Sequence, residues 1–517
     1  MSLAEHIAQT DYDTLAPLIA RLAQMQPEAW ALADDHQRLS YAELDAVMNR
    51  VAAALQRDGI APGQAIAICA QGSVAYASLF LGALRAGVVV APLAPSSTAQ
   101  TLAVMVRDAQ AQRVFIDAST ADLFDGIPGA QIWLDDQAPP HEAAANWSDW
   151  LAAPGVPAAH VDIDPLHPFN IIYSSGTTGT PKGIVQPHGM RWAHIKRGSA
   201  YGYSSQTVAL LSTPLYSNTT LVIFFPTLAH GGLVRIMPKF DAGHYLRIAQ
   251  DEGVTHTMLV PVQYHRLLAH PEFDAHDLSR FEHKFCTSAP MPKERKAEIL
   301  RRWPGGFVEF YGMTEGGASF ILNAHEHPDK LHTVGRAASG CVVKIIDESG
   351  QELPPGSKGE VVGHSKGMMN GYHGQADKTR EAEWFDADGL RYIRTGDIGQ
   401  LDEDGFLVLM DRRKDMVISG GFNIYPSDLE AQLRDHPAID DAAVVGVPSE
   451  AWGETPVAFV VLRDGRRDSA DELRAWFNGR VGKTQRLHDL IVQDELPRSA
   501  IGKVLKRELR EHYAATH

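Results

Sequence analysis

The stretch that decides the fold is NIIYSSGTTGTPKG, from Asn170 to Gly183. Asn170 to Tyr173 is strand-like, and the residues that follow are nearly all small or hydroxylated. Small residues let backbone amides approach an anion closely, and Lys182 adds a positive charge. An ordinary surface loop would not explain a Lys-Gly pair placed so soon after a strand. Because the GxxxxGK[ST] spacing of a Walker loop is absent, we predict a phosphate loop of another kind.

Helices and strands alternate on the N-terminal side of this loop. Ser40 and Glu43 fit a capping box in front of a helical run that stops at Gly59. Apolar strand-like and helical segments then follow one another at 64–69, 74–85, 88–92, 102–109 and 113–117. This alternation is typical of parallel sheets covered by helices. We therefore predict a large α/β N-terminal domain of layered sheets and helices.

The pattern changes after about residue 335. Strands and turns dominate from Val342 onward, so we expect a β-rich subdomain over about 336–413 of a core that spans 1–413. The remaining residues combine strands with helices near Ser427 and Asp471 and a final helix that begins near Lys503. These residues are numerous enough to form a small hydrophobic core of their own. We predict a small α+β C-terminal domain over 414–517, with the boundary at Lys414.

Composition and charge argue against several classes of partner. The 517 residues include 47 Lys and Arg against 63 Asp and Glu, a formal net charge of −16. This balance disfavours nucleic-acid binding and stable association with an anionic membrane. The sequence has no signal-peptide pattern, no run of about 18 apolar residues, and no disulfide or zinc spacing among its three cysteines. We expect a cytoplasmic protein.

Four further stretches follow the loop: FYGMTEGG at 310–317, YIRTGDIG at 392–399, MVISGGFNIYP at 416–426 and LPRSAIGKVLKREL at 496–509. In this order they make the chain resemble the adenylate-forming enzymes, which include acyl-CoA synthetases, luciferases and peptide-synthetase adenylation domains. The chain is most similar to the fatty-acyl and aryl-CoA ligase branch, from about Ser40 to Leu509. The resemblance implies ATP-dependent activation of a carboxylic acid as acyl-AMP, then transfer to coenzyme A, with AMP and pyrophosphate as products.

The resemblance also implies catalytic and metal-binding residues. Lys503, Thr178 and Glu315 are the implied catalytic residues, with Lys503 contacting the carboxylate and the α-phosphate as negative charge develops. Glu315 and Ser174 are the implied ligands of Mg²⁺, a hard cation that prefers oxygen. Lys414 takes the position of a hinge about which the C-terminal domain rotates.

The nucleotide site has its own implied residues. Tyr311 would stack on adenine, and Thr314 would touch the α-phosphate. Asp397 would accept hydrogen bonds from the ribose hydroxyls, and Arg412 would reach the ribose or a phosphate. The implied ATP and AMP set is Ser174, Ser175, Gly176, Thr177, Thr178, Lys182, Ser288, Ala289, Pro290, Glu309, Phe310, Tyr311, Gly312, Met313, Thr314, Asp397, Arg412 and Lys503.

Three segments, 216–220, 286–290 and 312–319, are expected to line the acid pocket. Gly316 and Gly317 would leave room near the carboxyl end of the acid. Ser217 stands where related aryl-CoA ligases often carry histidine, which puts the role of that position in doubt. Because no charged anchor is evident, we expect an apolar aryl, cinnamate-like or medium-chain fatty acid. The implied acid-binding residues are Tyr216, Ser217, Asn218, Gly312 and Gly317.

Coenzyme A is expected to meet the C-terminal domain at Ser419, Gly420, Gly421 and Trp452. Three alternatives stay open: an enzyme that loads a carrier-protein thiol, a luciferase-like oxygenase, and a catalytically inactive nucleotide-binding protein. The sequence does not distinguish a monomer from a homodimer.

Overall fold

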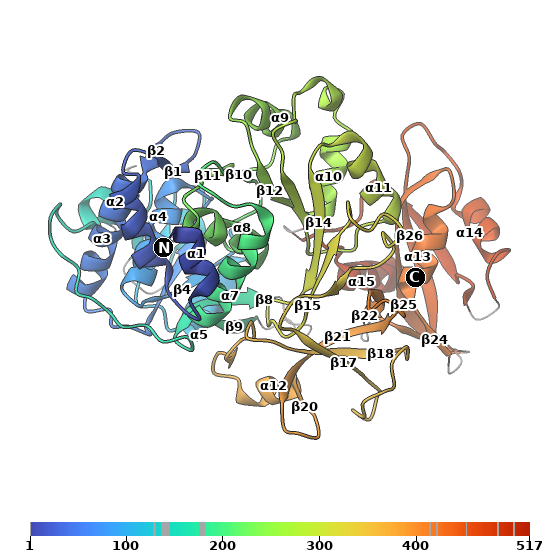
Figure 1. Cartoon of the computed structure of the whole chain (residues 1–517). Helices are drawn as coiled ribbons and strands as arrows, with labels where there is room; N and C mark the ends of the chain where they lie inside the picture. Colours follow the sequence, from blue (N-terminus) through green and yellow to red (C-terminus); the bar gives the residue numbers. More distant parts are fainter. Residues whose placement is uncertain are drawn as a thin grey trace. The chain divides into compact units, whose positions relative to one another are not determined.

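The computed structural model describes residues 2–127, 131–135, 145–174, 181–412, 415–419, 422–450, 452–482, 485–499 and 502–516. The chain forms two compact units (Figure 1). Unit 1 comprises Met1–Val342 and Gly363–Ile393, and unit 2 comprises Val343–Val362 and Arg394–His517. The α/β class with a smaller C-terminal α+β region is confirmed.

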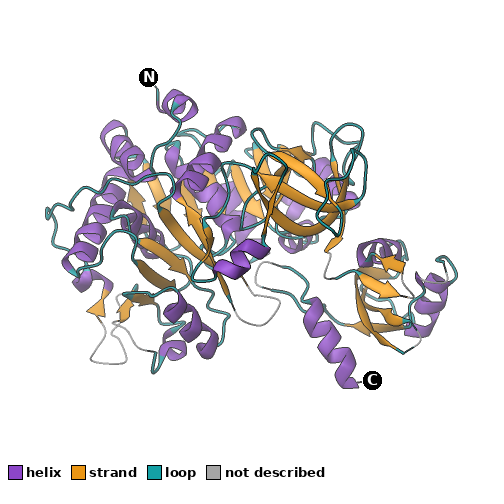
Figure 2. Ribbon diagram, turned by 90° about the horizontal axis from the view of Figure 1, so that it is seen from below, coloured by secondary structure: helices purple, strands orange, loops and turns teal. Residues whose placement is uncertain are grey.

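Unit 1 contains two extended sheets flanked by helices (Figure 2). Among the described residues, the first sheet has the order β19 (Gly371–Tyr372), β9 (Lys182–Pro187), β8 (Pro168–Ser174), β4 (Val89–Pro92), β3 (Ala65–Cys69), β5 (Val114–Ile116), β6 (Gln131–Trp133), β7 (Ala145–Asn146). The second has the order β16 (Arg336–Ala337), β15 (Ser319–Asn323), β14 (Gly306–Gly312), β13 (His283–Cys286), β12 (His256–Leu259), β10 (Val208–Leu211), β11 (Leu233–Ile236), β1 (Trp30–Ala33), β2 (Arg38–Ser40).

The α-helices of unit 1 are α1 (Leu3–Gln9), α2 (Leu15–Met25), α3 (Tyr41–Arg57), α4 (Val74–Arg85), α5 (Ala99–Asp108), α6 (Trp147–Trp150), α7 (His188–Gly198), α8 (Asn218–Ala229), α9 (Ala242–Asp251), α10 (Pro261–Leu268), α11 (Lys293–Arg302) and α12 (Ala376–Glu381). The predicted capping box holds the start of α3, since Ser40 and Glu43 bond each other's backbone amides at 3.3 and 2.8 Å. Helices α3 and α4 pack closely at Gly82, where a Cβ would lie 2.4 Å from the Cβ of Val51.

A third sheet has the order β17 (Val342–Ile346), β18 (Gly359–His364), β21 (Arg391–Leu401), β20 (Glu383–Phe385), with β22 (Leu407–Arg412) beside β21. The C-terminal sheet has the order β24 (Phe422–Ile424), β23 (Val417–Ser419), β26 (Gly453–Leu462), β25 (Ile439–Ser449), with β27 (Asp489–Gln493) beside β26. Its two faces carry separate apolar clusters, one with α13 (Pro426–Arg434) and α14 (Ala470–Asn478), the other with α15 (Lys506–Thr516).

The last helix begins later than predicted. We expected it near Lys503, whereas α15 begins at Lys506. Gly502 adopts a left-handed φ of 75°, and the Lys503 carbonyl accepts a 2.8 Å hydrogen bond from the Ser499 amide. This turn occupies the backbone groups that a first helical turn would need, so Lys503 lies in the turn before the helix.

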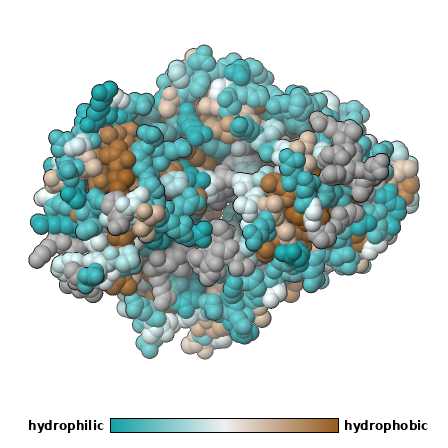
Figure 3. Space-filling model, turned by 180° about the vertical axis from the view of Figure 1, so that it is seen from behind, coloured by the Kyte–Doolittle hydropathy of each residue, from teal (hydrophilic) through white to brown (hydrophobic). Residues whose placement is uncertain are grey.

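On the face drawn in Figure 3, the surface is mainly hydrophilic. The face seen in Figure 3 carries apolar residues only in separate patches among polar ones. Among the described helices, none combines the length and the apolar character that crossing a membrane requires.

Candidate active site

Strands β8 and β9 flank the predicted phosphate loop. They pair antiparallel, and Ser174 faces Lys182 at the end of the ladder where the loop begins and returns. The Tyr173 hydroxyl anchors this end by donating a 2.7 Å hydrogen bond to Asp108 on α5. The predicted loop residues Ser175, Gly176, Thr177 and Thr178 lie outside the described residues. The structure therefore places the two ends of the loop, Ser174 and Lys182, side by side.

Tyr372 on β19 contacts both charged groups predicted for the phosphate and metal site. Its hydroxyl donates a 2.8 Å hydrogen bond to Oε1 of Glu315. Its ring faces Lys182, whose Nζ lies 5.0 Å from the ring centroid. Burial, and then the neighbouring Glu315 charge, raise the pKa of Tyr372, so the phenol stays neutral and remains a donor. The sequence reasoning missed Tyr372, which lies 57 residues from Glu315.

The backbone around Glu315 is held by the strand segment that precedes β19. The Glu315 carbonyl accepts a 2.8 Å hydrogen bond from the Met369 amide. Gly316 has a φ of 78°, and a Cβ there would lie 1.8 Å from the carbonyl oxygen of Gly367. We expected Gly316 to leave room for the acid, whereas the backbone of Gly367 fills that space. The glycine serves close backbone packing, which holds the main chain next to Glu315 in place.

A buried polar network lies on the other side of this segment. Gln186 on β9 donates a 2.7 Å hydrogen bond from Nε2 to the Thr314 carbonyl. Its Oε1 accepts a hydrogen bond from Arg191 on α7, which also donates to Asn218 Oδ1 at 2.7 Å and to Asn170 Oδ1 at 3.2 Å. Burial lowers the pKa of Arg191 to about 9. The network links the predicted phosphate-contacting segment to Asn218 of the predicted acid pocket.

Arg191 was also missed by the sequence reasoning, although a signal existed. His188, Arg191 and Ile195 follow one another at helical spacing, and all are buried on α7. An arginine within an apolar helical stripe usually has a buried polar partner, so its position pointed to an internal network.

The start of α8 contacts the second predicted acid-pocket segment. Thr219 Oγ1 lies 2.5 Å from Oγ of Ser288, a residue with a left-handed φ of 83°. The Ser217 hydroxyl accepts a 3.3 Å hydrogen bond from the Thr219 amide and caps the helix. The three segments expected to line the acid pocket are thus joined by hydrogen bonds, through Thr219 to Ser288 and through Asn218 and Gln186 to Thr314.

The predicted nucleotide residues on β14 differ in exposure. The carboxylate of Glu309 is buried in an ion pair with Lys296, and burial raises its pKa while Lys296 opposes that shift. The Phe310 ring stacks on Phe285 at 5.4 Å. This placement does not bring the Glu309 side chain to the surface. The half-buried or exposed members of the set in unit 1 are Ser174, Lys182, Ser288, Ala289, Pro290, Phe310, Tyr311, Gly312, Met313 and Thr314.

Unit 2 carries the predicted ribose group. Asp397 on β21 faces Arg412 on β22 in the ladder, and Arg412 Nε lies 3.3 Å from Asp397 Oδ1. The Asp397 amide donates a 3.0 Å hydrogen bond to the Thr395 hydroxyl, which fixes the local turn of the strand. A carboxylate and a guanidinium are thus presented together, as a ribose and phosphate site would require.

Two further predicted groups lie elsewhere in unit 2. Lys503 is half-buried in the turn before α15, where its amide donates a 3.2 Å hydrogen bond to the Ser499 hydroxyl. Ser419 on β23 pairs with Gly453, so it lies close in the sheet to Trp452, which is 44% exposed. The predicted hinge Lys414 and the predicted Gly420 and Gly421 lie outside the described residues.

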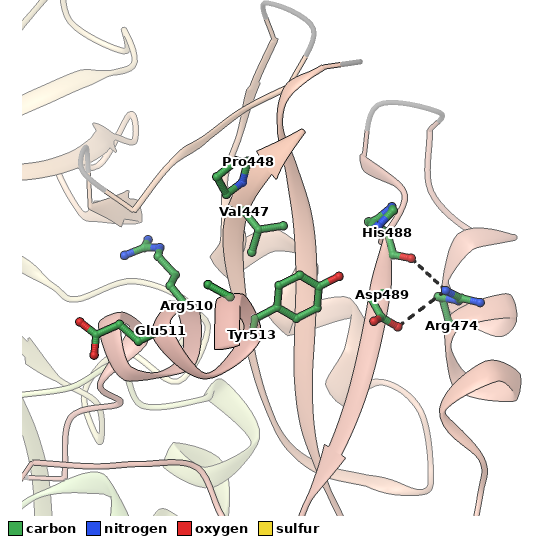
Figure 4. Close-up of a pocket in the computed structure, with 10 residues that line it drawn as sticks. Val447, Pro448, Arg474, His488, Asp489, Arg510, Glu511 and Tyr513 are labelled. Carbon is green, nitrogen blue, oxygen red and sulfur yellow. Dashed lines mark hydrogen bonds and ion pairs between the residues drawn. The ribbon is translucent and has the colours of Figure 1, made fainter. Parts of the chain in front are cut away.

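A cavity of about 830 Å³ also lies in unit 2, next to α15 (Figure 4). Its lining contains none of the residues predicted for ATP, the acid or coenzyme A. Arg474 pairs there with Asp489 at 3.7 Å, and Arg510 pairs with Asp415 at 3.0 Å. Because none of the predicted site residues lines it, we do not place the reaction in this cavity.

Comparison with known proteins agrees with this arrangement. The model of the family "AMP-binding enzyme" matches residues 19–373, and that of "AMP-binding enzyme C-terminal domain" matches residues 428–503. The chain is 32% identical to a feruloyl-CoA synthase from an Amycolatopsis species over 95% of the chain and 98% of that protein. It is 30% identical to the fatty acid–[acyl-carrier-protein] ligase ScoC of Streptomyces coeruleorubidus, over 97% of the chain and 96% of that protein.

A solved structure gives the same result. The ATP-bound MatB of Rhodopseudomonas palustris superimposes with a TM-score of 0.86 at 30% identity, covering 96% of this chain and 99% of that one. The long match in sequence and the match in structure confirm the resemblance drawn from the motifs. The chain therefore belongs to the family of AMP-binding enzymes, within the adenylate-forming superfamily.

Proposed function

We propose that the protein is an AMP-forming acid–CoA ligase that joins a carboxylic acid to coenzyme A through an acyl-AMP. The observation that carries this proposal is the continuous set of contacts in unit 1. It runs from Lys182 through Tyr372 to Glu315, and from Thr314 through Gln186 to Asn218. The set joins groups suited to phosphates and a cation with the start of a pocket for the acid.

The donor set around Glu315 fits a magnesium ion brought in with ATP. One carboxylate with phosphate oxygens is a common way to hold Mg²⁺, and Ser174 would add a hydroxyl oxygen. Tyr372 donates to Oε1 of Glu315, which orients the carboxylate that would hold the ion. When bound, the ion supplies positive charge against the phosphates of ATP.

In the proposed first step, the acid carboxylate attacks the α-phosphate and pyrophosphate leaves. Negative charge builds on the α-phosphate of the transferred adenylyl group, and Lys503 and the hydroxyl of Thr178 stabilise it. Lys182 holds the phosphates beside the loop as a point charge. Asp397 holds the ribose hydroxyls, with Arg412 beside it. No covalent enzyme intermediate is needed, because positioning and charge promote the displacement.

In the proposed second step, the thiol of coenzyme A attacks the acyl carbonyl and AMP leaves. The C-terminal domain turns about Lys414, which removes Lys503 and brings in Ser419, Gly420, Gly421 and Trp452. Such a rotation lets one site serve two half-reactions in order. The boundary at Lys414 and the cytoplasmic location stay predictions, and the choice between a monomer and a homodimer stays open.

The acid we propose is apolar with an aryl, cinnamate-like or medium-chain body. The feruloyl-CoA synthase similarity supports the aromatic acids, and similarity to the long-chain-fatty-acid–CoA ligase FadD13 of Mycobacterium tuberculosis, at 31% identity, supports the aliphatic ones. A second acceptor is also supported, because ScoC is a ligase for an acyl-carrier protein.

The test is acid-dependent release of pyrophosphate and AMP from Mg·ATP across benzoates, hydroxycinnamates and straight-chain acids. We expect pyrophosphate with a subset of the acids alone, and stoichiometric AMP with an acyl-CoA product only when coenzyme A is added. Turnover with a phosphopantetheinylated carrier protein but not with coenzyme A would replace the ligase by the carrier-loading enzyme. Absence of pyrophosphate with every acid would refute adenylation.

A further inference from the structure

Arg191 is a buried cation without a carboxylate partner among the residues that the structure describes. It is 1% exposed, and its hydrogen-bond partners are the amide oxygens of Asn170, Gln186 and Asn218, with His194 Nδ1 at 3.5 Å. The rings of Phe169 and Phe225 lie 5.5 and 5.9 Å from its Cζ. Burying a charge is costly unless polar groups surround it, so the three oxygens are held firmly toward Arg191.

This arrangement determines which way each amide lies. A guanidinium donates hydrogen bonds and accepts none, so each amide must turn its oxygen toward Arg191 and its nitrogen away. Gln186 shows the consequence directly, since its Nε2 donates to the Thr314 carbonyl at 2.7 Å. Gln186 Nε2 also lies 3.4 Å from Asn218 Oδ1, and this second donor reinforces the orientation of the Asn218 amide.

Asn218 differs from the other two amides in where it lies. It is the first residue of α8 and is half-buried, whereas Asn170 and Gln186 are fully buried on β8 and β9. Its Oδ1 accepts from Arg191, and the structure gives its Nδ2 no acceptor within the described ranges. Its neighbours Ser217 and Thr219 are engaged in the helix cap and in the contact with Ser288.

We propose that Arg191 positions the Asn218 amide so that its NH₂ group donates a hydrogen bond to the acid substrate, and that the enzyme prefers acids bearing an oxygen acceptor on their apolar body. The inference rests on the proposed ligase function and specifies its substrate class: ether, methoxy, hydroxyl or keto acids rather than pure hydrocarbons. Asn218 is the specificity-determining residue, and Arg191 is the positioning residue behind it.

Arg191 itself does not serve as the anchor for a second carboxylate. Its two terminal nitrogens donate to three amide oxygens, and among these partners only Asn218, the first residue of α8, is not fully buried. A dicarboxylic acid would meet the amide NH₂ first. At this point the pocket therefore offers the substrate an uncharged hydrogen-bond donor, the Asn218 NH₂ group.

The experiment compares acids that differ by one oxygen in the same shape: 4-methoxycinnamate with 4-ethylcinnamate, 4-methoxybenzoate with 4-ethylbenzoate, and an oxa-octanoate with octanoate. The readout is kcat/KM for pyrophosphate release by the full chain. In at least one pair we expect the oxygen-bearing acid to be favoured about 3- to 10-fold, the factor of one neutral hydrogen bond.

Two variants test the donor. Asn218→Leu removes it, and Asn218→Asp keeps the shape, replaces the NH₂ by an oxygen, and forms an ion pair with Arg191 that protects the fold. Both variants should lower the preference to about 1. Asn49→Asp is the control, because the Asn49 amide bonds only the backbone of Val156 and Ala158, and it should keep the wild-type preference.

The outcomes distinguish failure of this inference from failure of the proposed function. If the wild-type enzyme releases no pyrophosphate with any acid, the proposed function is wrong. If it turns over acids without preferring the oxygen-bearing members, only this inference is wrong. The same holds if the preference survives in both Asn218 variants, or if both variants reduce turnover of the two acids of a pair equally, which would assign the NH₂ group to the carboxyl end.

Discussion

The predicted site residues of unit 1 and unit 2 are held in different ways. In unit 1 the Glu315 side chain accepts from Tyr372 and its carbonyl accepts from Met369, while Gly316 packs against backbone. In unit 2 Lys503 lies in a turn and Trp452 is 44% exposed. The constrained groups around Glu315 and the less constrained Lys503 and Trp452 suit the proposed reaction, in which the former stay in place and the latter are exchanged between steps.

The largest loss of activity should come from replacing Lys503, which lies in the turn before α15 in unit 2. We expect Lys503→Ala to lower acid-dependent pyrophosphate release by about 10²–10³-fold, because a positive charge near the α-phosphate of the transferred adenylyl group is lost. Thiolysis of chemically supplied acyl-AMP should be retained. Rapid-quench assays of both half-reactions measure the difference.

Lys506→Met is the matched control for that variant. Lys506 Nζ lies 2.8 Å from Glu430 and is largely buried, so its loss should reduce the free energy of unfolding by roughly 2–3 kcal/mol. Pyrophosphate release per folded molecule should change little. Loss of stability without loss of activity in Lys503→Ala would contradict the comparison.

The next effect concerns the constrained set of unit 1. Glu315→Gln should reduce kcat/KM for ATP about 100-fold, because the carboxylate predicted to bind Mg²⁺ becomes neutral. Tyr372→Phe should raise the Mg²⁺ concentration for half-maximal activity about 3- to 10-fold, since one hydrogen bond to that carboxylate is lost. Magnesium titrations of activity, together with calorimetry of ATP binding at several Mg²⁺ concentrations, measure both.

Tyr12→Phe serves as the control for Tyr372→Phe. The Tyr12 hydroxyl donates to the carbonyls of Ile163 and Asp164, both at 3.1 Å, and touches none of the predicted site residues. Its magnesium requirement should equal that of the wild type. An equal shift in both variants would show that Tyr372 acts only on general stability.

A smaller effect, on stability, tests how much the buried network around Arg191 contributes to the free energy of unfolding. Arg191→Lys keeps a charge but cannot reach three amide oxygens at once, so the free energy of unfolding should fall by about 2 kcal/mol. Urea unfolding followed by fluorescence measures the loss. Arg107→Lys, on the exposed side of α5, should stay within about 0.5 kcal/mol of the wild type. Equal stability of the two variants would contradict the role given to Arg191.

The smallest effect should come from the exposed surface of unit 2. Trp452→Ala should raise KM for coenzyme A about 3- to 10-fold and leave pyrophosphate release in the first step unchanged. Trp30→Ala, at a tryptophan of unit 1 with 47% exposure, should leave KM for coenzyme A unchanged. An unaltered KM in Trp452→Ala would remove this residue from the proposed thiol surface.

Much of the local structure followed from the sequence. The α3 cap at Ser40 and Glu43 and the full extent of α4 were predicted from capping residues and apolar spacing, which act within a few positions. The start of α15 was predicted three residues too early. The helix starts later because the Ser499–Lys503 hydrogen bond and the left-handed Gly502 form a turn there. The spacing of apolar residues does not show whether a turn or a helix forms at such a position.

By itself the sequence determined the family, the α/β architecture and the identity of Glu315, Asp397 and Lys503 as candidate site residues, because long motifs carry these features locally. Only the tertiary structure decided that Tyr372 orients Glu315 and that Arg191 orients Asn218, 27 residues away. The packing also placed Lys182 beside the ring of Tyr372. Such contacts join residues that lie far apart in the sequence. Their distances and directions are set only when the sheets and helices have packed together.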